Sequence, residues 1–270
     1  MIKIYCSANP KAFQGYADIK TWNFPTGESG FKIEDVSQMS HEAYYDIYIK
    51  YESDSDIFLA AQAVDALDNL GVPKENIELI ISYLPYSRQD RVCHPGEGFS
   101  LNILMKFLET LGVNVTTYDI HSEAILEKYK FVSNIHQSDF TIYLPMHDFL
   151  IAPDAGAELK AKATAAWHET ELVCLKKQRI GSKIVYMDHE FDTIQGNVCV
   201  VDDLADKGGT FLALAEMLKR TQPNIKSLSL YVTHGFFTAG IDKLKQYYDN
   251  IYVANLMSTD PEVINFVKEI

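Results

Sequence analysis

The chain is poor in basic residues and contains no long apolar run. Lysine and arginine number 24 among 270 residues, against 37 acidic residues, which gives a formal net charge of −13 at pH 7. Nucleic acids and anionic membranes bind basic surfaces, so this charge argues against both as general partners. No stretch approaches the ~20 apolar residues of a membrane span, and the N-terminus lacks the apolar segment of a signal peptide. These absences predict a soluble protein of the cytoplasm with no nucleic-acid or membrane partner.

Cysteine is also scarce, and none of the cysteines forms a CxxC pair. The chain has four of them, Cys6, Cys93, Cys174 and Cys199. We expect free thiols, mostly buried, in a reducing compartment. What the chain does have is apolar content: hydrophobic residues make up 47% of it, enough for a substantial core. Its length suits one large domain or two ordinary ones.

Short β-branched runs alternate along the chain with stretches of helical periodicity. This alternation is typical of an α/β fold with mostly parallel sheets flanked by helices, in which ligands bind beyond the carboxyl ends of the strands. Residues 33–57 fit neither pattern clearly, although alternate positions from 45 to 51 resemble a strand. The predicted strands are 2–6, 77–83, 113–119, 149–152, 172–175, 198–201, 227–233 and 251–254, with 57–59 as a weaker candidate. The predicted helices are 58–70, 100–111, 158–167, 210–220 and 240–248.

A turn signal, "YLPMHD" at 143–148, separates two blocks of alternating strands and helices. It predicts two domains, 1–140 and 141–270, each with its own sheet. The final residues, 257–270, have two possible places. They either complete the second domain or pack back on the first.

The stretch "VDDLADKGGT" (201–210) joins acids to a glycine turn. The glycines allow a tight turn that presents N–H groups, and a helix start adds the positive end of a dipole, which suits a phosphate. Carboxylates accept hydrogen bonds from vicinal hydroxyls, so the combination predicts a sugar phosphate as ligand. The alternative is a plain strand-to-helix turn with solvated acids. The candidate ribose-phosphate-binding residues are Asp202, Asp203, Asp206, Lys207, Gly208, Gly209 and Thr210.

This stretch resembles the phosphoribosyl-diphosphate motif of type I phosphoribosyltransferases and of ribose-phosphate pyrophosphokinases. Two blocks, "PYSRQDR…GEG…DIHSE" within 83–123 and "IAPDAGAELKAKATA" (151–165), resemble the pyrophosphokinases alone. Shorter matches are "FPTGE" (24–28), "AVDALDNLGV" (63–72) and "YVTHGFFTAGIDKL" (231–244). The resemblance implies two phosphoribosyltransferase-type, Rossmann-like domains. The N-terminal one would contact ATP and the C-terminal one would carry the sugar-phosphate loop. It also implies a homo-oligomer with its active site near a subunit boundary.

The resemblance assigns roles only where residues match. Arg88, Gln89 and Asp90 match the residues that hold ATP, and an arginine after a buried strand is a forked donor for phosphate oxygens. The alternative for Arg88 is a structural pair with Asp90. Phe24 and Glu28 match the loop that cradles the adenine.

His121 and Asp154 match the region that binds the catalytic Mg²⁺. Mg²⁺ prefers oxygen ligands, so His121 could equally be a phosphate or outer contact, or a core histidine. Lys177 and Arg179 match the Lys-x-Arg of the family's mobile catalytic loop; the alternative is a basic surface turn.

The implied reaction moves the β,γ-diphosphate of ATP to the anomeric hydroxyl of ribose 5-phosphate and releases AMP. Mg²⁺ and cations at the bridging oxygens would stabilise the charge that develops there. A phosphoribosyltransferase would not need the "RQD" and "DIH" motifs. A catalytically silent regulatory homologue would have no reason to keep Arg88, Asp154, Lys177 and Arg179 together. We therefore expect an active enzyme.

Several positions depart from the family pattern. Thr26 and Lys176 each replace an aspartate, the Arg-bearing regulatory segment is not recognisable in 35–48, and the C-terminal end is short. Lys207 replaces a hydroxyl residue that touches the 5-phosphate. It is either a solvent-facing lysine or a contact for a more negative acceptor such as ADP-ribose. The pattern then resembles a phage-associated branch that makes ADP-ribose pyrophosphate for NAD salvage, which would act in the host cytoplasm.

Overall fold

The computed structural model describes residues 2–6, 17–37, 39–180, 183–186 and 194–270. The chain divides into two compact units, residues 1–135 and 136–270, each of which has its own sheet and core. Among the described residues, no helix is both long enough and apolar enough to cross a membrane.

The first unit is built on a five-stranded parallel sheet with the order β1-β4-β5-β6-β7. Its central strands carry β-branched and leucine side chains, and Ile47, Leu79 and Val115 are fully buried in the core. The strands are β1 (Ile2–Cys6), β4 (Tyr45–Ile49), β5 (Ile77–Ile81), β6 (Asn114–Tyr118) and β7 (Val132–Ile135). Both faces of such a sheet must be covered, which explains its apolar strands.

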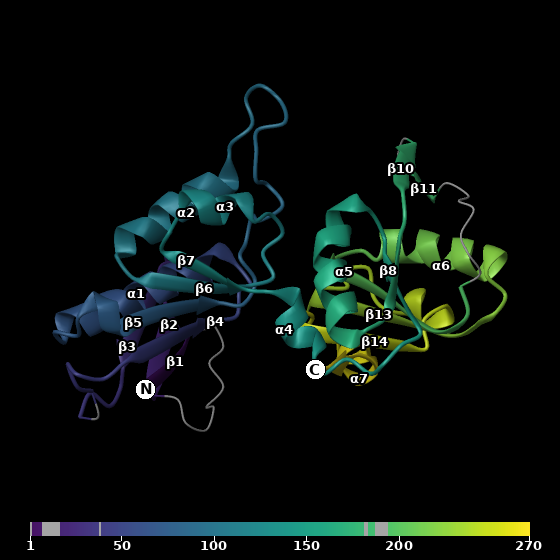
Figure 1. The fold of residues 1–270 in the computed structure, drawn as a ribbon. Helices are drawn as coiled ribbons and strands as arrows, with labels where there is room; N and C mark the ends of the chain where they lie inside the picture. Colours follow the sequence, from purple (N-terminus) through teal and green to yellow (C-terminus); the bar gives the residue numbers. More distant parts are fainter. Residues whose placement is uncertain (1, 7–16, 38, 181–182, 187–193) are drawn as a thin grey trace. The chain divides into compact units, whose positions relative to one another are not determined.

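Helices and one antiparallel hairpin cover the sheet of the first unit. The Ser53 N–H donates to the Asp56 carboxylate (2.8 Å) at the start of α1, and Gly112, with φ +70°, ends α2. The helices α2 and α3 lie side by side (Figure 1). Lys128, the last residue of α3, and Tyr129, which follows it, both donate to Asn102 of α2. These elements are α1 (Asp54–Asn69), the 3₁₀ turn η1 (Lys74–Asn76), α2 (Ser100–Leu111), α3 (Ala124–Lys128) and the hairpin β2 (Ile19–Asn23) with β3 (Ser29–Ile33).

The second unit has a six-stranded sheet with the order β15-β14-β13-β12-β8-β9, in which every pair is parallel. Val200, Leu230 and Val253 of its three central strands are fully buried. The strands are β8 (Phe149–Ala152), β9 (Glu171–Cys174), β12 (Gly196–Ala205), β13 (Ile225–Gly235), β14 (Asn250–Leu256) and β15 (Lys268–Glu269). Strands β12 and β8, neighbours in this sheet, carry the site described below.

Figure 1 shows a short antiparallel hairpin, β10 with β11, projecting from this second unit. It follows the edge strand β9 directly, and it returns the chain toward α6 and β12. The remaining elements are α4 (Gln137–Thr141), α5 (Ala155–His168), β10 (Lys177–Ile180), β11 (Lys183–Tyr186), α6 (Gly209–Thr221), the 3₁₀ turn η2 (Leu244–Gln246) and α7 (Pro261–Phe266).

The structure confirms the predicted α/β class with mostly parallel sheets. The strands at 2–6 and 149–152 and the helix at 100–111 have the predicted bounds. The weaker strand candidate at 57–59 is wrong, because those residues lie within α1. The final residues join the second unit, where β15 pairs with β14.

The predicted helix at 240–248 is also wrong. Ile241, Leu244 and Tyr248 have helical spacing and are buried, but only the 3₁₀ turn η2 forms. Residues 241–247 form turns around η2, and the chain enters β14 at Asn250. Here the apolar spacing reflects packing against the core and not a regular helix.

Candidate active site

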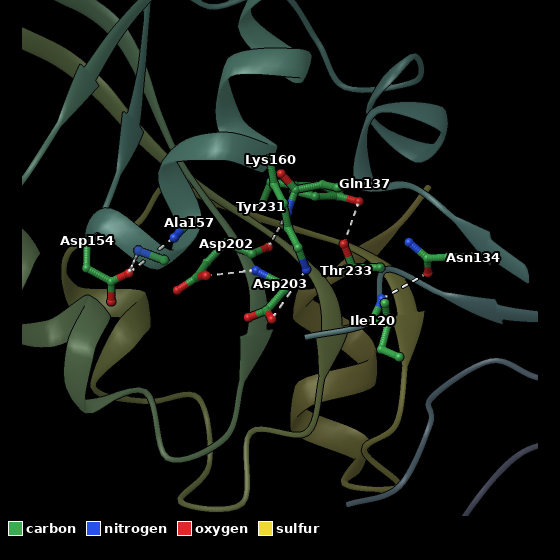
Figure 2. A network of polar contacts seen from close by, with 11 residues as sticks. Ile120, Asn134, Gln137, Asp154, Ala157, Lys160, Asp202, Asp203, Tyr231 and Thr233 are labelled. Carbon is green, nitrogen blue, oxygen red and sulfur yellow. Dashed lines mark hydrogen bonds and ion pairs between the residues drawn. The ribbon is translucent and has the colours of Figure 1, made fainter. Parts of the chain in front are cut away.

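The carboxyl edge of the second unit's sheet carries a cluster of acids. Strand β12 includes Asp202 and Asp203 close to its end, and Asp154 lies two residues after the end of β8, the neighbouring strand. Because parallel strands end at the same edge, these carboxylates lie together there (Figure 2). The sequence motifs at 151–165 and 201–210 are thus brought to one place by the pairing of two strands.

A glycine turn joins β12 to α6 at this edge. Gly208 adopts a left-handed conformation (φ +76°) and is the N-cap of α6, which has no capping side chain. The first-turn N–H groups of α6 therefore remain available to a ligand, and the helix dipole adds to their attraction for an anion. Lys207 and Gly209 are exposed beside them.

Asp206 holds this turn against the segment after β13. Its carboxylate accepts a hydrogen bond from the Thr238 hydroxyl (2.6 Å), and its carbonyl accepts from the Thr238 N–H (3.0 Å). The contact fixes the entry to α6, so in this structure Asp206 has a structural role in shaping the turn.

The adjacent acids Asp202 and Asp203 have contacts that differ from those of Asp206. Asp203 forms an ion pair with Lys160 of α5, with 3.6 Å between Oδ2 and Nζ. The Asp203 N–H donates to the Asp202 carboxylate (2.8 Å), and the Gln137 amide donates to the Asp202 carbonyl (2.9 Å; Figure 2). Burial raises the pKa of Asp202 well above its usual value, and the neighbouring charge of Asp203 raises it further.

Asp154 is the N-cap of α5 and pairs with Lys177. One carboxylate oxygen accepts the N–H groups of Gly156 (2.9 Å) and Ala157 (3.2 Å). The other contacts the Lys177 Nζ at 2.5 Å, and both side chains are largely shielded from solvent. Burial alone would raise the pKa of Asp154, but Lys177 and the two N–H groups outweigh it and lower that pKa. Lys177 is therefore part of the acidic cluster and not a residue of a basic surface turn.

Lys177 begins the β10–β11 hairpin, and its cross-strand partner is Tyr186. The Tyr186 ring is buried in the core of the second unit, and its hydroxyl has no hydrogen-bond partner among the described residues. Burial raises the pKa of Tyr186, and the charges of Asp154 and Asp202 raise it further. Arg179 lies in β10 two residues after Lys177, but its side chain is outside the described part of the chain.

The first unit holds the predicted ATP-binding residues in the loop between β5 and α2. Tyr86 turns the chain with φ +62°, and the Gln89 N–H donates to the Tyr86 carbonyl (2.7 Å). Arg88 and Gln89 are exposed and Asp90 is partly buried. This loop follows β5 at the carboxyl edge of the first unit's sheet.

His121 follows β6, the strand beside β5, so it lies at the same edge as the loop that carries Arg88. It is exposed, which excludes the core-histidine alternative. Asp119, with φ +40°, turns the chain there, and the Ile120 N–H donates to the Asn134 side chain (3.0 Å; Figure 2).

Phe24 and Glu28 occupy the tip of the β2–β3 hairpin. The Phe24 N–H donates to the Glu28 carbonyl (2.8 Å), and Gly27 (φ +96°) closes the turn. The Thr26 hydroxyl bonds to the Glu28 carboxylate. The Phe24 ring is 49% exposed, which leaves an aromatic face available for a planar ligand.

No group of three or more His, Cys, Asp or Glu residues that could hold a metal ion occurs in the described part of the chain. Mg²⁺ commonly uses one or two carboxylates and takes its remaining ligands from water and substrate phosphates. Asp154 and Asp202 offer oxygen donors of this kind at one sheet edge, so the donor chemistry fits Mg²⁺ bound together with a phosphate substrate. His121, in the first unit, offers a nitrogen donor, which Mg²⁺ favours less.

The sequence interpretation missed three residues of the cluster, Lys160, Gln137 and Tyr186. Lys160 stands within the quoted 151–165 block, and its place on the same helix as Asp154 was a usable signal. Gln137 and Tyr186 had no such sequence signal. The docking of α4 brings Gln137 to the site, and the register of the β10–β11 hairpin brings Tyr186 there.

No protein-family model matches the chain. Individual relatives do match over nearly its full length. The chain is 31% identical to a ribose-phosphate pyrophosphokinase of Thermococcus kodakarensis, over 94% of this chain and 90% of that protein. It is 30% identical to that of Pyrococcus abyssi, over 93% and 88% of the two chains.

Among solved structures, the phosphoribosylpyrophosphate synthetase from Mycobacterium smegmatis shares the fold, with a TM-score of 0.70. It is 18% identical, and the match covers 88% of this chain and 80% of that one. Together with the acids, glycine turn and lysine gathered at one sheet edge, these relatives show that the chain belongs to the ribose-phosphate pyrophosphokinase family of diphosphotransferases.

Proposed function

We propose that this protein transfers the β,γ-diphosphate of ATP to the anomeric hydroxyl of ribose 5-phosphate, giving PRPP and AMP. The observation that carries the proposal is the juxtaposition, at one sheet edge, of the carboxylates Asp202 and Asp203 with the uncapped start of α6. Two hydroxyl-accepting groups beside an anion site match a sugar phosphate better than either a free phosphate or a neutral sugar.

Each half of the acceptor has a partner of suitable chemistry. The ribose hydroxyls would donate to Asp202 and Asp203, and these hydrogen bonds to ionised acceptors are stronger than neutral ones. The 5-phosphate would accept from the N–H groups at the start of α6, next to Gly208. The helix start thereby offsets the repulsion that the acids alone would exert on the phosphate.

Lys177 supplies positive charge where the reaction develops negative charge. As the anomeric oxygen attacks the β-phosphorus, the bond to the α-phosphate oxygen breaks and that oxygen gains charge as AMP leaves. Lys177, with Arg179 on the same strand, would hold this charge. The ion pair with Asp154 keeps the lysine at the site before substrate arrives.

The first unit would bind ATP. Arg88, Gln89 and Asp90 would contact the nucleotide, with the Arg88 guanidinium as a forked donor to phosphate oxygens. His121, exposed at the same edge, would add a phosphate contact. Phe24 and Glu28 would pack against and hydrogen-bond the adenine.

Mg²⁺ would be held by Asp154 together with the phosphates of ATP, and when bound it would neutralise charge on those phosphates. The Asp154 oxygen that contacts Lys177 accepts no backbone N–H, so it would be the one available to the ion once the lysine binds the substrate. We also expect a cytoplasmic homo-oligomer in which the tip of the β2–β3 hairpin reaches a neighbouring subunit.

The test is an AMP-release assay. With Mg²⁺, ATP and ribose 5-phosphate, the purified protein should form AMP and PRPP in equal amounts, and omission of any component should stop the reaction. Free phosphate or ADP in place of AMP would contradict diphosphate transfer. A protein that binds ribose 5-phosphate but releases no AMP would instead be the silent regulatory homologue.

ADP-ribose is a second candidate acceptor, favoured by one observation. Lys207 is exposed at the glycine turn, at the position where the motif that the sequence resembles has a hydroxyl side chain. An acceptor whose 5′ end continues into a diphosphate would bring extra negative charge to this lysine. The same assay with ADP-ribose decides between the acceptors, because the preferred one gives the higher kcat/KM.

A further inference from the structure

The β10–β11 hairpin carries a buried tyrosine, Tyr186, opposite Lys177. In the register of β10 with β11, Tyr186 pairs directly with Lys177. Residues that face each other across an antiparallel pair point to the same side of the strands, with Cβ atoms about 5 Å apart. Lys177 turns toward Asp154 on that side. Tyr186 therefore points toward the same cluster.

The two ends of the Tyr186 side chain have different surroundings. The ring belongs to the apolar core of the second unit, and the residue is only 6% exposed. The hydroxyl is buried without a hydrogen-bond partner among the described residues. Buried hydroxyls in folded proteins nearly always have a partner, and for a hydroxyl beside a candidate ligand site a bound ligand would supply one.

Asp154 and Asp202 lie close enough to influence the Tyr186 hydroxyl electrostatically, yet neither forms a hydrogen bond with it. Both are strong acceptors, so a hydroxyl within reach of them would donate to them. A ligand group placed between the hydroxyl and the carboxylates would satisfy both sides. That group must accept from a phenol and donate to a carboxylate.

A sugar hydroxyl has both capacities. Its hydrogen can go to Asp202 while its lone pairs accept from Tyr186. A phosphate oxygen can accept but has no hydrogen for the carboxylate, and the two acids repel it. The residues around Tyr186 thus select a hydroxyl over an anion at this point of the site.

We propose that Tyr186 contacts the acceptor directly, donating a hydrogen bond to the ribose hydroxyl that Asp202 accepts from. The inference rests on the proposed function, because it assumes a ribose acceptor at Asp202. It adds a specificity-determining residue to the reaction. It also connects acceptor binding to the proposed action of Lys177, since the same β10–β11 hairpin would present Tyr186 to the sugar and Lys177 to the departing AMP.

The test compares Tyr186→Phe with a matched control, Tyr248→Phe. Tyr248 is buried in the same core, but its hydroxyl already donates to the Phe211 carbonyl (2.9 Å). Each change deletes one hydroxyl and keeps the ring. Measurements are the KM for ribose 5-phosphate, the dissociation constant by calorimetry, kcat, and the Tm of the substrate-free protein.

For Tyr186→Phe we expect the acceptor KM and dissociation constant to rise about tenfold, the effect of one lost hydrogen bond. Its Tm should equal or exceed the wild-type value, because the deleted hydroxyl is buried and forms no hydrogen bond with any residue that the structure describes. For Tyr248→Phe the Tm should fall while KM and kcat stay at wild-type values.

Two results would overturn the inference. One is an unchanged acceptor KM and dissociation constant in Tyr186→Phe. The other is a rise in KM accompanied by a fall in Tm as large as that of Tyr248→Phe, since the loss would then be structural. A wild-type protein that releases no AMP contradicts the proposed function by itself; calorimetry with ribose 5-phosphate then still tests Tyr186, and absence of binding rejects both.

Discussion

The Lys177 ammonium lies 2.5 Å from the Asp154 carboxylate, and this ion pair connects the β10–β11 hairpin to the start of α5. The lysine side chain is 16% exposed and that of the aspartate 28%, so the pair is screened less by water than a surface pair. It places the Lys177 ammonium against the carboxylate that is the candidate ligand of Mg²⁺. When a complex of Mg²⁺ with ATP binds, Mg²⁺ would replace the Lys177 ammonium as the cation next to the Asp154 carboxylate.

Lys177→Ala should lower kcat by ~10³ or more, judging from cations that stabilise phosphoryl transfer elsewhere. The dissociation constant of ribose 5-phosphate should change by less than about threefold, because in the proposed mechanism the lysine contacts the leaving group and not the sugar. Lys176→Ala is the matched control, since Lys176 is the exposed neighbour. Single-turnover AMP release and calorimetry measure the two quantities. A kcat near the wild-type value would remove Lys177 from the mechanism.

Asp202→Asn should stabilise the substrate-free protein at neutral pH. Burial and the charge of Asp203 raise the folded-state pKa of Asp202, so the folded state binds a proton more readily than the unfolded state does. This tighter proton binding stabilises the folded state at low pH, and the stabilisation is lost as pH rises through the raised pKa of Asp202. The asparagine removes the penalty, which is on the order of 1 kcal/mol per unit of pKa shift.

The gain in Tm from Asp202→Asn should therefore be largest near pH 7 and should shrink toward pH 4. Thermal unfolding across this range measures it, with Asp206→Asn as the control, because asparagine can still accept the Thr238 hydrogen bond. Binding of ribose 5-phosphate should weaken in Asp202→Asn. A Tm difference independent of pH would show that the carboxylate carries no burial penalty.

Lys207→Thr should shift acceptor preference toward ribose 5-phosphate if the lysine binds the 5′ diphosphate of ADP-ribose. The lysine is exposed, so the change should leave Tm within about 1 °C of wild type, as most surface substitutions do. The ratio of kcat/KM for the two acceptors is the readout, with Lys219→Thr on α6 as the control. An unchanged ratio would identify Lys207 as a solvent-facing residue.

Arg88→Gln should raise the KM for ATP by about tenfold or more, because it removes a charged, forked donor to phosphate oxygens. The KM for ribose 5-phosphate should stay the same, since its candidate site lies in the second unit. Lys106→Gln on α2 serves as the control for lost charge in the same unit. Equal KM values for ATP in the two variants would exclude Arg88 from nucleotide binding.

Local sequence was sufficient for the α/β class, most of the central strands and the helix at 100–111. Those elements depend on the spacing of apolar residues, which a sheet buried on both faces and an amphipathic helix each require. The motif at 201–210 likewise predicted a strand, a turn and a helix start, because its Asp, Lys and Gly residues separate two apolar segments. The segment at 240–248 shows the limit, since buried residues with helical spacing there form only a 3₁₀ turn.

The contacts of the candidate site come from pairings between distant segments. Asp154 meets Asp202 because β8 and β12 are neighbours in the sheet, and Lys177 meets Asp154 because a hairpin after β9 turns back over that edge. Tyr186 reaches the cluster through one register of that hairpin; a slip of one residue would direct it to the opposite face. The residue types thus predicted the chemistry of the candidate site, while strand order and register determined which side chains meet there.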